Sequence, residues 1–290
     1  DALIDAAPSA DALFAVALLD AVATMRNPRS LDRAAALLSH SDPRVRVAAA
    51  RAVAWSGNTK YVSPLTDVIA NSTPETQVAA YDAVLRLADA MNRNGGNWDA
   101  TMSLYKEVLA TAPQHATRAA AMMGLGRFGD GSVIDAIVAA SAAANGELDD
   151  QAAMALTSLQ GREGVTGAIA AYPKLSEASR AAMLSIWGQQ KQSEALDLVQ
   201  SELKSETPAL RTAALHALAG IGSMKGFAAL VDVAKNGSDE KRAFALSAVK
   251  QMAGNLGNTG DTQAAGLAFV QLYGLTDDDA LRADALRGIA

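Results

Sequence analysis

Small and aliphatic residues recur at intervals of three and four along most of the chain. From Asp42 the sequence reads DPRVRVAAARAVAWSGNTKYVSPLTDVI, in which Val, Ala and Leu return at helical spacing. This spacing places the apolar side chains on one face of a helix. Runs of β-branched and aromatic residues, which are typical of strands, are absent. The pattern predicts an all-α chain.

The same pattern returns further along the chain. The stretch TPALRTAALHALAGIGSMKGFAALVDVA, from Thr207, aligns with the stretch from Asp42 without a gap. The separation corresponds to five repeats of roughly 33 residues, a length known among helical repeats. Weaker copies fill the interval, and a helix pair is predicted over residues 9–38. A last copy begins at Asp277, so the chain holds about eight units and a fragment. The matched positions include Pro43 with Pro208, Arg46 with Arg211, and Gly57 with Gly222.

Each unit is predicted to form two antiparallel helices. Pro or Asp opens the first helix, where a missing N–H is harmless and a carboxylate suits the helix dipole. Gly57, Gly129 and Gly222 close first helices and are predicted to adopt the left-handed cap conformation. A single pair cannot bury its apolar face alone, so neighbouring pairs must stack. The sequence therefore predicts one α-solenoid over residues 1–290, with at least fourteen helices and no sheet.

The repeated motif resembles a known family. The pattern D-P-x-V-R-x-A-A-x-x-A-V-x-x-x-G-N, followed by a second helix, is similar to HEAT repeats of the phycobilisome-lyase-like, bacterial type. The resemblance covers nearly the whole chain, although the fifth and sixth units lack the opening proline. Such repeats occur in scaffolds, adaptors and a few lyases. The resemblance implies the fold and leaves these functions open.

An arginine occupies the same place in most units. A position that is repeated in this way indicates a role in stacking, by bonding to the carboxylate or turn carbonyls of the next unit, whereas a catalytic arginine would occur once. Trp55 and Trp187 fall near the ends of first helices and are predicted to fill the core. The repeated arginines are Arg46, Arg118, Arg211, Arg242 and Arg282.

Composition and charge argue against several classes of partner and site. The net charge is −6, and the 25 basic residues are scattered, which argues against nucleic acid as a partner. The chain has no cysteine, which excludes disulfides and thiolate metal sites. No apolar run reaches the roughly 18 residues of a membrane span. The low charged fraction of 19% favours an exported protein, periplasmic or extracellular, over a cytoplasmic one.

No motif for catalysis, a metal or a cofactor is present. His40, His115 and His216 lie far apart, without the spacing that places two metal ligands on one helix face. The glycine-rich stretch at Gly126 lacks the lysine and the preceding strand of a phosphate loop. The carboxylates of residues 277–279 are adjacent, which suits a helix start better than a calcium loop. We therefore expect no catalytic residue, no metal and no cofactor.

Two insertions interrupt the repeat, around Gly95 and Gly96 and around Gly257 and Gly260. Long loops on a rigid scaffold often contact ligands, although interhelical turns also lengthen freely. The first insertion carries Trp98, which is a candidate contact for a partner.

The leading hypothesis is a non-catalytic scaffold that binds a protein or peptide on a concave surface lined by second helices. The acidic tilt of that surface would suit a partner of basic character. The alternative is a HEAT-like enzyme: a chromophore lyase, or a DNA-base glycosylase, which would need a basic groove with aromatics. The candidate binding residues on second helices are Asp67, Lys106, Glu107, Asp135, Asp197, Glu202 and Asp232.

The last residues read as an internal repeat. Leu281, Ala285, Leu286 and Ile289 match the apolar positions of a first helix. A terminal unit normally carries a polar outer face. We expect further repeats, another domain or a neighbouring chain to pack on this end.

Overall fold

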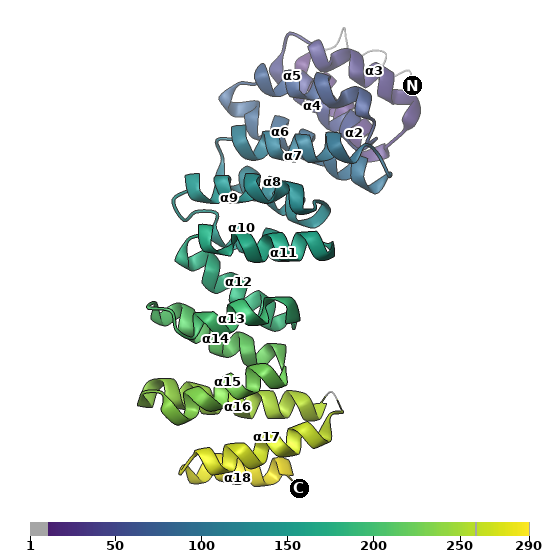
Figure 1. Ribbon diagram of the computed structural model, residues 1–290. Coiled ribbons are helices and arrows are strands. Elements are labelled where there is room, and N and C mark those ends of the chain that lie inside the picture. The colour runs from purple at the N-terminus through teal and green to yellow at the C-terminus, as the bar shows by residue number, and fades with distance from the viewer. Residues whose placement is uncertain (1–10, 259, 290) are drawn as a thin grey trace. The chain divides into compact units, whose positions relative to one another are not determined.

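The computed structural model describes residues 11–258 and 260–289 of the protein (Figure 1). In these two stretches the chain forms seventeen α-helices, six short 3-10 helices and no strand. The all-α prediction and the minimum of fourteen helices are confirmed. Residues 9 and 10 of the first predicted pair lie outside the described residues.

The chain divides into two compact units, residues 1–160 and residues 161–290. Within each unit, first helices carry even numbers and second helices carry odd numbers. The first unit contains α2 (Ala12–Met25), α3 (Leu31–Ala36), α4 (Pro43–Ala54), α5 (Val62–Ala70), α6 (Pro74–Arg93), α7 (Trp98–Thr111), α8 (His115–Phe128), α9 (Ile134–Ala143) and α10 (Asp149–Ser158). The second contains α11 (Gly161–Ala171), α12 (Glu177–Gln189), α13 (Leu196–Glu202), α14 (Pro208–Ile221), α15 (Met224–Asn236), α16 (Asp239–Asn258), α17 (Thr262–Leu275) and α18 (Asp279–Ile289).

Helix ends follow the sequence signals at most positions. Asp42 caps α4 by accepting a hydrogen bond of 2.8 Å from the backbone N–H of Arg44. Gly57 and Gly222 adopt the predicted left-handed conformation, with φ of 61° and 71°. The same prediction for Gly129 is wrong, because its φ is −86°. At Gly129 the requirement is space: a Cβ there would lie 2.4 Å from the Leu125 carbonyl oxygen.

The first helices of each unit pack backbone against backbone. In the first unit, a Cβ on Gly126 of α8 would lie 2.4 Å from the Cα of Ala155 on α10. In the second unit, a Cβ on Gly188 of α12 would lie 2.7 Å from the Cα of Ala217 on α14. Side chains this small let helix axes approach closely.

Alanine-rich helices approach more closely than helices with larger side chains. The prediction that second helices line a concave surface remains a prediction.

The repeated arginines bind the ends of second helices, as predicted. Nη1 of Arg46 donates hydrogen bonds of 2.8 and 2.9 Å to the carbonyls of His40 and Ser41, which follow α3. Its Nη2 donates a hydrogen bond of 2.6 Å to the carbonyl of Asn71, at the end of α5. One cation thus joins the C-terminal ends of two successive second helices, where the helix dipole favours positive charge. Related contacts join Arg211 to Ser205 and Glu206, Arg242 to Leu275, Arg282 to Thr276, and Arg118 to the Glu147 carboxylate.

The two tryptophans near first-helix ends behave differently. Trp187 is 2% exposed and stacks on Tyr172 with ring centres 5.8 Å apart, which confirms its place in the core. Trp55 is only partly buried and lines a surface pocket, so the prediction that it fills the core is wrong. It follows the last residue of α4, where the helix no longer faces its neighbours on both sides.

Both insertions lengthen a first helix instead of forming a long loop. Helices α6 and α16 reach 20 residues each, whereas α4 has 12. Ala90 and Met91, inside the first insertion, are buried and continue the apolar face of α6. The turn that remains before α7 spans residues 94–97. The expectation of extended ligand-binding loops is therefore wrong.

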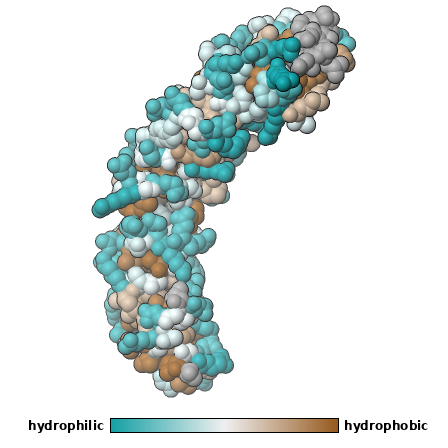
Figure 2. Space-filling view, turned by 90° about the vertical axis from the view of Figure 1, so that its right-hand side faces the viewer, coloured by the Kyte–Doolittle hydropathy of each residue, from teal (hydrophilic) through white to brown (hydrophobic). Residues whose placement is uncertain are grey.

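Apolar side chains remain exposed on the last two helices. Leu267 and Val270 of α17 are 57% and 53% exposed, and Leu286 of α18 is 54% exposed. Hydrophobic surface is visible at the lower end of the view in Figure 2, where these helices lie. Ala285 is the only residue of α18 that the structure describes as buried.

Candidate binding groove

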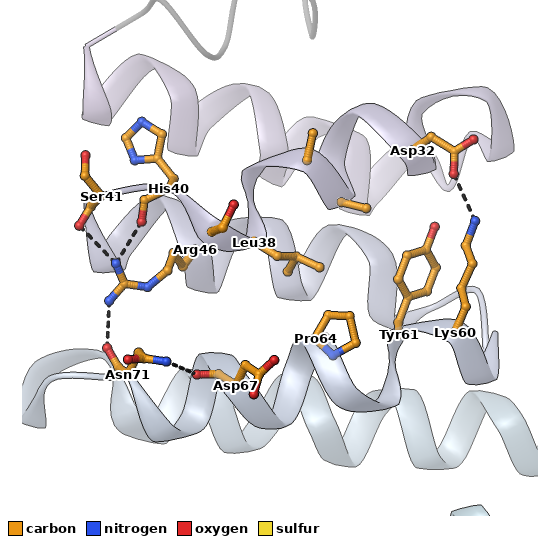
Figure 3. A pocket seen from close by; sticks show the side chains of 13 residues that line it. Asp32, Leu38, His40, Ser41, Arg46, Lys60, Tyr61, Pro64, Asp67 and Asn71 are labelled. Atoms are coloured by element: carbon orange, nitrogen blue, oxygen red, sulfur yellow. Dashed lines mark hydrogen bonds and ion pairs between the residues drawn. The ribbon is translucent and has the colours of Figure 1, made fainter.

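An open groove lies between α3 and α5, two second helices of the first unit (Figure 3). Its volume is about 800 Å³. Its lining includes Asp32, Leu38, His40, Arg46, Lys60, Tyr61, Pro64, Asp67 and Asn71.

Polar contacts bridge the groove at both ends. At one end Arg46 spans it through the three carbonyls described above (Figure 3). At the other end the ammonium of Lys60 donates a hydrogen bond of 2.9 Å to the Asp32 carboxylate. The hydrogen bond with the Asp32 carboxylate raises the pKa of Lys60. These contacts link the elements on the two sides of the groove.

The floor between the bridges is largely apolar. Leu38 and Pro64 line it together with Tyr61, whose ring points into the space between the helices (Figure 3). Tyr61 is 2% exposed, and its hydroxyl makes no hydrogen bond with any residue that the structure describes. An unpaired buried polar group costs about 1–3 kcal/mol.

Asp67 supplies the groove's unpaired charge. Its side chain is exposed on α5 and forms no hydrogen bond or ion pair within the described part of the chain. It is the one candidate binding residue from the sequence that lies in the groove. The groove therefore offers a carboxylate, an apolar floor and a buried hydroxyl within one space.

The other candidates are spread over both units and are not brought together. Trp98 donates an indole hydrogen bond of 2.9 Å to the Phe128 carbonyl, which ties α7 to the end of α8. Several of the charged candidates hold local contacts, while Glu107 is exposed on α7. The contacts are Lys106 with the Ser132 carbonyl, Asp197 with Lys225, Glu202 with Arg180, and Asp232 with Asn236; Asp135 lies on α9.

The histidines take separate places, as their spacing predicts. Nδ1 of His40 accepts a hydrogen bond of 3.0 Å from the backbone N–H of Asp42, beside the groove. His216 packs edge-on against Phe244, and His115 contacts the Glu147 carbonyl. In residues 11–258 and 260–289, no three His, Asp or Glu side chains are grouped so that they could hold a metal ion. Sequence reasoning missed Tyr61, because a tyrosine at the start of a second helix has no periodic signal.

No helix in the described part of the chain combines the length and apolarity that a membrane span requires.

The stacked helix pairs and the arginines that join them define an α-solenoid of the HEAT/armadillo kind. HEAT repeats match residues 1–84 and 165–250, and a PBS lyase HEAT-like repeat matches residues 117–142. The chain belongs to the HEAT repeat family. No curated protein sequence matches it significantly.

Solved structures are similar to the chain at low sequence identity. An engineered protein has a TM-score of 0.43 at 17% identity, covering 99% of this chain and 86% of its own. Human deoxyhypusine hydroxylase, in complex with glycerol, has a TM-score of 0.37 at 15% identity, covering 87% and 95%. A designed armadillo repeat protein in complex with the peptide (KR)4 has a TM-score of 0.29 at 16% identity, covering 77% and 99%. We infer no function from similarities of this size.

Proposed function

We propose that the protein is a non-catalytic scaffold that binds a peptide segment of a partner protein in the groove between α3 and α5. Solenoids of this family commonly mediate protein binding through extended surfaces. The observation that carries the proposal is the groove itself, with the apolar side chains of Leu38 and Pro64 in its floor and the unpaired Asp67 carboxylate at its edge. Both walls of the groove are second helices, the helices on which the sequence places the binding surface.

The lining specifies the chemistry of the segment. A volume of about 800 Å³ lies within the range of ligand sites and holds a few residues of a peptide. An apolar side chain would contact Leu38 and Pro64. A lysine or arginine would pair with Asp67, which agrees with a partner of basic character.

The remaining polar groups of the groove support a binding role without chemistry. Arg46 is held by three carbonyls, and Lys60 is paired with Asp32. Catalysis by proton transfer needs an acid or base that is free to exchange its proton with a substrate. Apart from Asp67, the charged groups of the groove are paired with other groups of the protein.

Selection of random peptides on the immobilised protein tests the proposal. Peptides that are enriched should carry a basic residue beside an apolar one. Asp67→Lys should weaken their binding roughly tenfold, which corresponds to about 1.4 kcal/mol. Glu107→Lys makes the same charge change on another second helix and should alter Kd by less than about twofold.

Two results would contradict the proposal. The first is the absence of any enriched peptide. The second is equal binding by wild type and Asp67→Lys, which would place the bound peptides elsewhere.

A further inference from the structure

A second pocket lies on the row of first helices in the first unit. Helices α2, α4 and α6 form it where their C-terminal ends come together, and its volume is about 360 Å³. It is separate from the groove, whose walls are second helices. Its lining is Asp20, Ala23, Thr24, Arg26, Arg51, Trp55, Arg86 and Arg93.

The pocket is basic although the protein is acidic. Four arginines line it, against a single aspartate. Arg26 follows α2, Arg51 lies on α4, and the other two lie on α6. The sequence contains no basic run that would indicate this pocket. Stacking brings the arginines together from three helices.

Two of the arginines are paired and two are not. Arg51 contacts Asp20 at 3.0 Å, and Arg86 contacts Asp82, which lies outside the lining, at 2.7 Å. The side chains of Arg26 and Arg93 are exposed and make no hydrogen bond or ion pair within the part of the chain that the structure describes. Two guanidinium groups are therefore free to bind an anion.

Buried donors in the pocket also lack acceptors. The indole nitrogen of Trp55 and Nε of Arg51 are buried and have no hydrogen-bond partner among the described residues. Both residues line the pocket. Arginines at helix C-termini also stabilise the helix dipoles. That role explains their charge, but it supplies no acceptor for these two donors.

We propose that this pocket binds the carboxylate of an acidic segment in a partner protein. A guanidinium matches a carboxylate with two parallel hydrogen bonds. Tryptophan and arginine are also the residues that most often dominate protein interfaces. A pocket of this size takes one or two side chains, and the net charge of −6 opposes a long polyanion such as nucleic acid. The site goes beyond the groove and does not depend on it.

The experiment uses a fluorescein-labelled hexaglutamate peptide and measures anisotropy with the full chain. Wild type should bind it in a salt-dependent way. The double variant Arg26→Ala/Arg93→Ala should weaken Kd at least about tenfold. The control Arg29→Ala/Arg162→Ala removes the same charge from exposed sites outside the pocket and should change Kd less than about twofold.

Trp55→Phe provides a second measurement, because it removes the indole N–H and keeps an aromatic ring. It should weaken hexaglutamate binding, because the pocket loses one hydrogen-bond donor. Equal binding of hexaglutamate by Arg26→Ala/Arg93→Ala and by the control Arg29→Ala/Arg162→Ala would overturn the proposal. The pocket arginines would then serve only to stabilise the helix ends. Tighter binding of oligothymidine than of hexaglutamate, lost in the same variant, would overturn the choice of partner.

Discussion

Two glycines in the second unit should respond in opposite ways to substitution by alanine, because only one of them lies at a close contact between first helices. Gly188 on α12 is buried, and a Cβ there would lie 2.7 Å from the Cα of Ala217. Backbone atoms at this distance must shift apart, and overpacking of this kind costs about 1–3 kcal/mol. Gly266 on α17 has no atom within 4 Å of its added Cβ.

Alanine is favoured over glycine in a helix by up to about 1 kcal/mol. Gly266→Ala should therefore raise the free energy of unfolding by roughly 0.5–1 kcal/mol. In Gly188→Ala the cost of overpacking exceeds the gain in helix propensity. The free energy of unfolding should therefore fall by about 1–2 kcal/mol.

Urea unfolding followed by circular dichroism measures both variants, with the midpoint and the slope m compared with wild type. Both sites lie in the same unit, which makes them a matched pair. Stabilisation of equal size in the two variants would refute the backbone contact between α12 and α14.

Three further predictions concern the groove and its ends. Arg46→Met should lower the free energy of unfolding by about 1.5–3 kcal/mol in urea titrations, because three carbonyls lose a charged donor, whereas Arg44→Met should cost less than about 1 kcal/mol. Tyr61→Phe should leave the free energy of unfolding unchanged or raise it by about 1 kcal/mol, because the buried hydroxyl has no hydrogen-bond partner. A decrease of more than about 1 kcal/mol in thermal unfolding would show that the hydroxyl has a partner. The hydrogen bond from Arg44 lowers the pKa of Asp42 to about 2, so its stabilisation is present above the unfolded pKa of roughly 4 and is lost as the pH falls towards 2. The urea midpoint of Asp42→Asn should fall less than that of wild type over this window, and parallel curves would contradict the assignment.

The repeat was readable in the sequence because each unit carries the same local signals. Pro43, the arginine three residues later and the small residues that follow all act within one helix pair, so their spacing predicts the pair directly. The structure confirms the helices and the contacts of Arg46 with the ends of second helices.

The surfaces were harder to predict because they depend on distances between units. Periodicity does not report how closely neighbouring backbones approach, as they do at Gly126 and Gly188. The basic pocket gathers Arg26, Arg51 and Arg93 from three helices, so scattered charges in the sequence become a cluster in space. The Asn and Gly residues before Trp98 indicated a loop. The structure shows instead that Ala90 and Met91 are buried and continue the helix.

Protection of the groove by a selected peptide tests the central claim most directly. The chain has no cysteine, so Ala36→Cys introduces one thiol into the groove lining, and Ala110→Cys introduces one on the exposed surface of α7. Maleimide labelling of each variant is timed with and without a peptide selected on wild type. We predict that the peptide slows labelling at position 36 roughly tenfold and leaves position 110 unchanged. Equal labelling rates at position 36 with and without bound peptide would contradict binding in the groove.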